Sequence, residues 1–136
     1  MPLMTWIEEM SVGVKVLDDD HKTLIAMLNE LHDGIEAGHA RAALESVIEG
    51  LSRYTRIHFG REERLFAQTG FPGGEAHKAE HYRLSRRVMN LQSRFESGQS
   101  IELSLETLNF LKNWLTDHIQ GSDREYGPYF NAKGIK

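Results

Sequence analysis

Apolar residues recur at alternating steps of three and four in four stretches of the chain, and Gly, Pro, Ser or Asp residues separate these stretches. This spacing places the apolar residues of each stretch along one face of a helix. The pattern therefore predicts four helices, at about residues 19–37, 41–68, 75–97 and 104–121. A short N-terminal arm that contains Trp6 and a C-terminal tail from Tyr126 onward flank them.

The connections between these helices are short, which makes consecutive helices antiparallel neighbours. We therefore expect an all-α fold, an antiparallel up-down-up-down four-helix bundle. The 136 residues, of which 40% are hydrophobic, suit a single domain over residues 1–136 that builds a core without disulfides.

Histidines occupy the ends of the predicted helices. Five of the seven lie on the inward-facing stripes: His21, His58, His77, His81 and His118. They fall at the start of the first helix, the end of the second, the start of the third and the end of the fourth. These four ends meet in an antiparallel bundle, so the five imidazoles are expected at one level of the core.

The composition restricts the chemistry of such a cluster. The chain has no cysteine, so a metal would be held by nitrogen and oxygen from His, Asp and Glu. The net charge of −4 with scattered Lys and Arg argues against a nucleic-acid partner. No apolar run approaches the ~20 residues that cross a bilayer, and the first residues lack a signal-peptide layout. We expect no membrane partner and a cytoplasmic location.

Two carboxylates complete the candidate ligand set. Glu62 lies four residues after His58, as His81 lies after His77, so each pair shares a helix face. Asp123 lies five residues after His118, a spacing that separates two side chains by ~140° on a regular helix. Both can face the metals only if the helix tightens, bulges or unwinds, which Gly121 permits.

Burying five imidazoles without partners would cost about 1–3 kcal/mol for each unsatisfied polar group, and a bound metal removes that cost. Two six-coordinate ions offer twelve positions. Five histidines, two bridging carboxylates and a bridging hydroxo or oxo group leave one position open. The count predicts two Fe ions (Fe²⁺/Fe³⁺) that take one small ligand, although affinity order alone leaves zinc and manganese as alternatives.

The chain resembles the bacteriohemerythrins of the hemerythrin family over nearly its whole length. The resemblance rests on Trp6, on Asp18-Asp19-Asp20-His21-Lys22 and on the runs HFGREE, HKAEH and WLTDHIQGSD. All seven ligand positions of the family are matched. The resemblance implies that three histidines, His77, His81 and His118, hold a coordinatively full iron. It also implies that O2 binds the iron held by His21 and His58, with Glu62 and Asp123 bridging both.

An apolar pocket around the bound O2 is a further implication of the resemblance, because water must be kept from the site. The matching positions are Leu24, Phe59, Trp114, Leu115 and Ile119. Each of them can equally be read as ordinary core.

Residues behind the ligands are less well determined by the sequence. Ligand histidines usually donate their second N–H to a carboxylate or carbonyl, and three carboxylates are candidates that the sequence does not rank: Asp20, Glu63 and Asp117. Tyr54 is expected to pack, whereas the role of Tyr126 is left open. His32 is too far along the first helix to be a ligand, and His39 is expected on the surface.

The function indicated is reversible O2 binding as a carrier, a store or a sensor, with NO or other small molecules as further ligands. The alternatives are a di-iron enzyme, such as an oxidase, a peroxidase or an NO-handling protein, and an iron store. Five neutral ligands and only two anions favour holding O2 over splitting it, because O2-activating members of this architecture surround iron with more carboxylates.

Overall fold

The computed structural model describes residues 3–98 and 101–136, except for the side chains of Ile101, Ile119, Gln120, Ser122 and Asp123. Four long helices form most of it: α1 (Lys15–Glu36), α2 (Ala40–Thr69), α3 (Gly74–Glu96) and α4 (Ile101–Asn113). The last continues as a π-helical segment, η2 (Trp114–Ser122). Three short helices complete the described part, which contains no strand: η1 (Glu8–Met10), η3 (Asp123–Glu125) and α5 (Gly127–Ala132).

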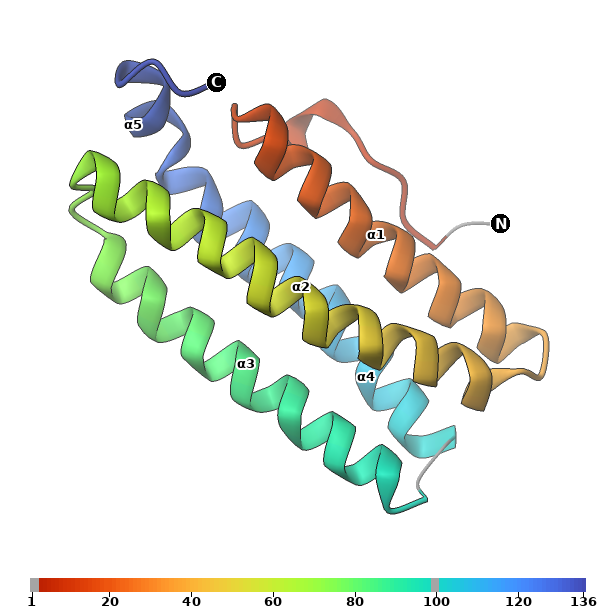
Figure 1. Cartoon of the computed structure of the whole chain (residues 1–136). Helices are drawn as coiled ribbons and strands as arrows, with labels where there is room; N and C mark the ends of the chain where they lie inside the picture. The colour runs from red at the N-terminus through yellow and green to blue at the C-terminus, as the bar shows by residue number, and fades with distance from the viewer. Residues whose placement is uncertain (1–2, 99–100) are drawn as a thin grey trace.

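The four helices alternate in direction along the bundle (Figure 1). Helix α1 packs against α2 and α4, and α2 packs against α3. The start of α1, the end of α2, the start of α3 and the end of η2 lie at one end of the bundle, beside α5 (Figure 1). The all-α antiparallel bundle predicted from the sequence is confirmed.

Two helices begin earlier than the sequence indicated. Helix α1 begins at Lys15 instead of residue 19, and the carboxylate of Asp18 lies in its first turn, where it accepts hydrogen bonds from Ser11 Oγ and the Val12 N–H. Helix α4 begins at Ile101 instead of Ser104. Both extensions bury an apolar side chain, since Leu17 and Leu103 have no exposed surface. Fully burying a leucine contributes about 1.5–3 kcal/mol, which favours the longer helices.

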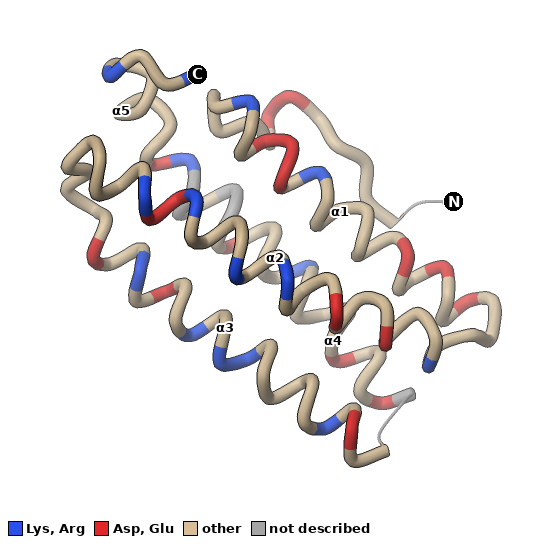
Figure 2. Tube along the Cα trace, viewed as in Figure 1, with Lys and Arg blue, Asp and Glu red and all other residues tan. Residues whose placement is uncertain are grey.

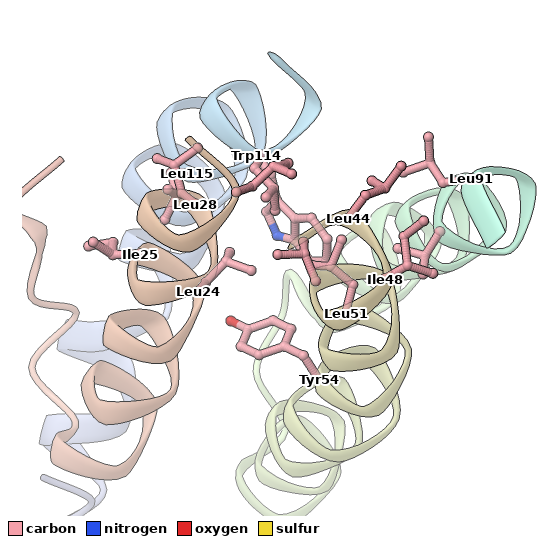
Figure 3. Packing of buried hydrophobic residues seen from close by; sticks show 14 of the residues in the cluster. Leu24, Ile25, Leu28, Leu44, Ile48, Leu51, Tyr54, Leu91, Trp114 and Leu115 are labelled. Atoms are coloured by element: carbon pink, nitrogen blue, oxygen red, sulfur yellow. The ribbon is translucent and has the colours of Figure 1, made fainter. Parts of the chain in front are cut away.

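Two hydrophobic clusters fill the bundle. The larger, shown in part in Figure 3, lies in the middle of the bundle and at the end opposite α5. It includes Leu24, Leu28 and Leu51. The smaller lies at the other end: Val12, Val14, Leu17, Phe66, Tyr126 and Phe130. Along α1 and α2, the buried polar side chains fall between these clusters, since His21 lies between Leu17 and Leu24.

Within the described residues, none of the helices combines the length and the apolar composition that crossing a bilayer requires. Charges of both signs are interleaved on α2 and α3, whereas acidic residues are frequent on α1 (Figure 2).

Candidate metal centre

Helices α1 and α2 bring three buried side chains together, from His21, His58 and Glu62. The Nε2 atoms of the two histidines lie 3.2 Å apart. Glu62 is one turn beyond His58 on α2, and its Oε1 lies 3.3 Å from His58 Nε2. Glu62 has no exposed surface at all. A carboxylate buried to this extent needs cationic or hydrogen-bonding partners.

Helix α3 and the segment η2 bring three further histidines to the other side of Glu62. All three are buried: His77, His81 and His118. The distance to Glu62 Oε1 is 2.9 Å from His81 Nε2 and 3.9 Å from His77 Nε2. The ring of His118 lies 4.8 Å from that of His77, centroid to centroid. Glu62 Oε1 therefore lies within 3.3 Å of a ring nitrogen from each of the two groups of histidines.

The six side chains form two overlapping sets of potential metal ligands. One set holds three histidines with Glu62, the other holds His21 and His58 with Glu62, and the ligand atoms of each set lie within 4.8 Å of one another. Neutral imidazole nitrogens with a shared carboxylate suit a pair of first-row transition-metal ions. The donor set therefore fits a di-iron centre, in which Glu62, common to both sets, would be a ligand of both ions.

The fourth helix changes its hydrogen-bonding pattern near Gly121, where the sequence predicted a departure from a regular helix. Segment η2, from Trp114 to Ser122, is π-helical and contains both His118 and Gly121. Its i→i+5 hydrogen bonds widen the helical turn, so residues five apart come closer to the same face. The backbone of Asp123 begins η3 directly after this segment. The predicted ligand role of Asp123 concerns a side chain that lies outside the described residues.

Carboxylates lie behind three of the histidines. Three pairs share this geometry: His58 Nδ1 with Asp20 Oδ2 at 2.8 Å, His81 Nδ1 with Glu63 Oε2 at 2.9 Å, and His118 Nδ1 with Glu80 Oε1 at 2.6 Å. A carboxylate accepts the proton of Nδ1, which fixes the tautomer that leaves the Nε2 lone pair free for a metal. All three rings are thus held ready to bind through Nε2.

Arg61 is a second partner of Asp20, besides His58. Burial would raise the pKa of its carboxyl group, but the hydrogen bonds from His58 and Arg61 and the charge of Arg61 together hold that pKa below its usual value. Asp20 therefore carries a negative charge in the folded protein and acts as an acceptor.

Of the three carboxylates that were candidates for a contact with a ligand histidine, Asp117 makes no such contact. Asp20 and Glu63 contact ligand histidines, but the partner of His118 is Glu80, and Asp117 is exposed. Asp117 is the neighbour of His118 in sequence, so on a helix its side chain leaves in a different direction from the histidine. Glu80 reaches His118 from α3, a contact that no spacing within the fourth helix reveals.

The sequence left the role of Tyr126 open, and the structure places this residue against Glu62. It is fully buried in the smaller hydrophobic cluster, and its hydroxyl donates a hydrogen bond to Glu62 Oε2. The phenol therefore orients the carboxylate that both groups of histidines share. Tyr54 packs as expected, with its ring stacked on that of His58 at a centroid distance of 4.7 Å.

Removing the hydroxyl of Tyr126 is expected to destabilise the protein, because a hydrogen bond to a buried charged group contributes about 1.5–3 kcal/mol. Urea unfolding of iron-free Tyr126→Phe measures the loss. Tyr129→Phe is the matched control, since Tyr129 donates a 2.5 Å hydrogen bond to the neutral carbonyl of Thr69. An equal or larger loss in the control would contradict the role assigned to Tyr126.

The described residues among those expected to form an apolar pocket are all buried. Four of the five are described, and each is almost fully buried: Leu24, Phe59, Trp114 and Leu115. The ring of Phe59 stacks on His81 at 3.8 Å, nearly parallel to it, and lies 5.7 Å from the ring of Trp114. The side chain of Ile119 lies outside the described residues.

The two remaining histidines stand away from the cluster. His32 lies beside Asp33 and Glu36 near the end of α1, and His39 is exposed before α2. Neither belongs to the two ligand sets.

These features define the class to which the protein belongs, a four-helix bundle with a histidine-rich dinuclear metal site in its core. A model of the hemerythrin HHE cation binding domain matches residues 12–130. The chain is 37% identical over 133 residues to a bacteriohemerythrin of Methylococcus capsulatus, which covers 97% of this chain and 100% of the relative. It is 36% identical over 132 residues to a bacteriohemerythrin of Stenotrophomonas maltophilia, covering 97% and 84%.

Solved structures agree with these sequence comparisons. A wild-type hemerythrin crystal structure superposes with a TM-score of 0.81 at 36% identity, over 93% of this chain and 96% of that one. A point mutant of hemerythrin gives a TM-score of 0.83 at 35% identity, over 94% of this chain and 97% of that one. The chain belongs to the hemerythrin family, as the resemblance of its motifs indicated.

Proposed function

We propose that the chain binds O2 reversibly at two iron ions held by seven residues: His21, His58, Glu62, His77, His81, His118 and Asp123. The observation that carries this proposal is the sharing of one buried carboxylate, Glu62, by two sets of histidine nitrogens. Membership of the hemerythrin family, whose members bind O2 at a di-iron centre, supports the same function.

The two ligand sets are unequal, and the inequality suggests where O2 binds. Three histidines accompany Glu62 on one side, and only His21 and His58 accompany it on the other. An iron held by His21, His58 and Glu62 would have fewer protein ligands than its neighbour, so it is the one that would have a position for O2. When bound, the ferrous pair supplies the electrons that O2 accepts reversibly.

The protein contributes the conditions for reversibility. Leu24, Phe59, Trp114 and Leu115 are buried, and Phe59 stacks on His81, so these apolar side chains would exclude water, which would otherwise promote irreversible oxidation. Carboxylates behind the rings hold the imidazoles in one tautomer. Neutral imidazoles dominate the ligand set, which favours release of intact O2 over its cleavage.

The decisive test follows the absorption spectrum of the iron-loaded, anaerobically reduced protein while O2 is admitted and then removed. A colour change that reverses on removal of O2 supports the proposal. Turnover with release of an oxidised product would favour the di-iron enzyme instead, and iron uptake with no O2-dependent spectrum would favour iron storage.

Leu115→Asp is expected to accelerate autoxidation at least several-fold, because a carboxylate in this buried position draws water into the apolar pocket. The decay of the oxygenated absorption band in air measures the rate. Leu105→Asp is the matched control, since Leu105 lies on α4 with 49% of its surface exposed. Equal decay rates in Leu115→Asp and the wild type would show that Leu115 does not protect the site.

The other expectations from the sequence stay predictions: NO as a further ligand, a cytoplasmic location, and no nucleic-acid or membrane partner.

A further inference from the structure

An arginine on α2 holds the carboxylate that lies behind His58. Arg61 Nη1 is 2.7 Å from Asp20 Oδ1 and 2.6 Å from Asp20 Oδ2. Asp20 Oδ2 also accepts the Nδ1 proton of His58 at 2.8 Å. Arg61 is 32% exposed, Asp20 20% and His58 2%, so the three side chains lead from the surface to the metal centre.

The contacts from Arg61 through Asp20 to His58 also join α1 and α2, the two helices that carry the two-histidine site. Arg61 and His58 lie one turn apart on α2, and Asp20 lies on α1 directly before His21. Acidic residues of α1 and basic residues of α2 occur near the same end of the bundle (Figure 2). The ion pair therefore links α1 and α2 close to His21 and His58.

The charge of the arginine has an electronic consequence for His58. A carboxylate that accepts the Nδ1 proton makes Nε2 a stronger electron donor to a metal. A cation bound to that carboxylate opposes the effect, because it withdraws electron density from the oxygens and adds positive potential nearby. Glu63, behind His81, forms no ion pair with a Lys or Arg among the described residues. The His58 and His81 sides of the centre thus differ in the charge behind their ligands.

We propose that Arg61 is a positioning residue for the O2-binding iron, acting through Asp20. It fixes the orientation of the His58 ring and limits electron donation from Nε2, which keeps the iron pair in the ferrous form that binds O2. This role rests on the proposed function, since it concerns the iron to which O2 binding is assigned.

Three variants test the role: Arg61→Gln, Arg61→Lys and Arg64→Gln. Arg64 is an exposed arginine three residues further along α2, so its replacement removes the same charge without touching Asp20. The midpoint potential of the di-iron pair and the autoxidation rate are measured for each variant. Arg61→Gln should lower the potential and speed autoxidation by about tenfold, the smallest change in metal affinity or activity that is typical of losing a partner behind a metal ligand. Arg61→Lys should restore most of the wild-type behaviour, and Arg64→Gln should leave it unchanged.

A second measurement does not depend on O2 or on iron. Zinc binds nitrogen and oxygen ligands without redox chemistry, so the zinc-loaded protein gives long-range ¹H–¹⁵N spectra of its histidine rings. The Nδ1–H signal of His58 should move in Arg61→Gln and stay in place in Arg64→Gln. A thermal unfolding scan confirms that each variant is folded.

Two results would overturn the proposal. One is an equal change of potential in Arg61→Gln and Arg64→Gln. That result would show that the potential responds to the net charge of the protein and not to the contact between Arg61 and Asp20. The other is an unmoved His58 signal in zinc-loaded Arg61→Gln. Failure of the wild type to bind O2 reversibly would instead overturn the proposed function, and the zinc spectra would still decide whether Arg61 positions His58.

Discussion

Glu62→Gln is expected to abolish binding of the iron pair while leaving the helical bundle folded. Glu62 is the one residue common to both ligand sets, and its oxygens face His58, His81 and Tyr126. A neutral amide of the same shape still accepts a hydrogen bond, but it removes the negative charge that two cations share. Iron bound per chain after anaerobic loading, measured by elemental analysis, should fall from two to below one.

Glu49→Gln provides the matched control for this loss. Glu49 lies on the same helix and is exposed, so its replacement removes one charge from α2 outside the metal centre. Circular dichroism should show the same helix content in both variants and the wild type. Full iron loading of Glu62→Gln would mean that the carboxylate does not bridge the two ions.

Removal of the metal is expected to lower the unfolding temperature by roughly 15 °C. The reason is that ions binding only the folded state stabilise it by about 4 kcal/mol when present at 1,000 times their dissociation constant. Each kcal/mol corresponds to about 4 °C for a chain of this size. The iron-free protein must also keep five histidine rings and Glu62 buried together, a cost that the metals offset. Calorimetry with and without a chelator measures the difference.

The chelator experiment has two internal controls. Glu62→Gln should show almost no chelator-dependent shift, because it lacks the bound pair. His39→Ala should show the full shift, since His39 is exposed and outside both ligand sets. A wild-type protein whose unfolding temperature is indifferent to the chelator would contradict tight metal binding in the folded state.

The convergence of the histidines could be predicted because it depends on local rules. Apolar spacing sets the face of each helix, and short connections force neighbouring helices to run antiparallel. Those two facts are enough to bring His21, His58, His77 and His118 to one level. Glu62 follows from its spacing to His58 on the same face. The sequence also indicated a departure from regular helix near Gly121, and the π-helical segment η2 lies there.

The surroundings of these ligands could not be predicted in the same way. Glu80 behind His118, Tyr126 on Glu62 and Arg61 on Asp20 are contacts across 38, 64 and 41 residues of sequence. Spacing along one helix carries no information about which long side chain of another helix reaches a given atom. The placement of Asp123 as a ligand stays a prediction.

The sequence by itself thus determined the helices, their inward faces and the histidines that meet, because periodicity along a helix is a property of the local chain. Only the tertiary structure decided which carboxylates and which phenol stand behind those ligands, and where α1 and α4 begin. These outcomes depend on the relative rotation and translation of packed helices. The burial of apolar side chains such as Leu17 and Leu103 determines that packing.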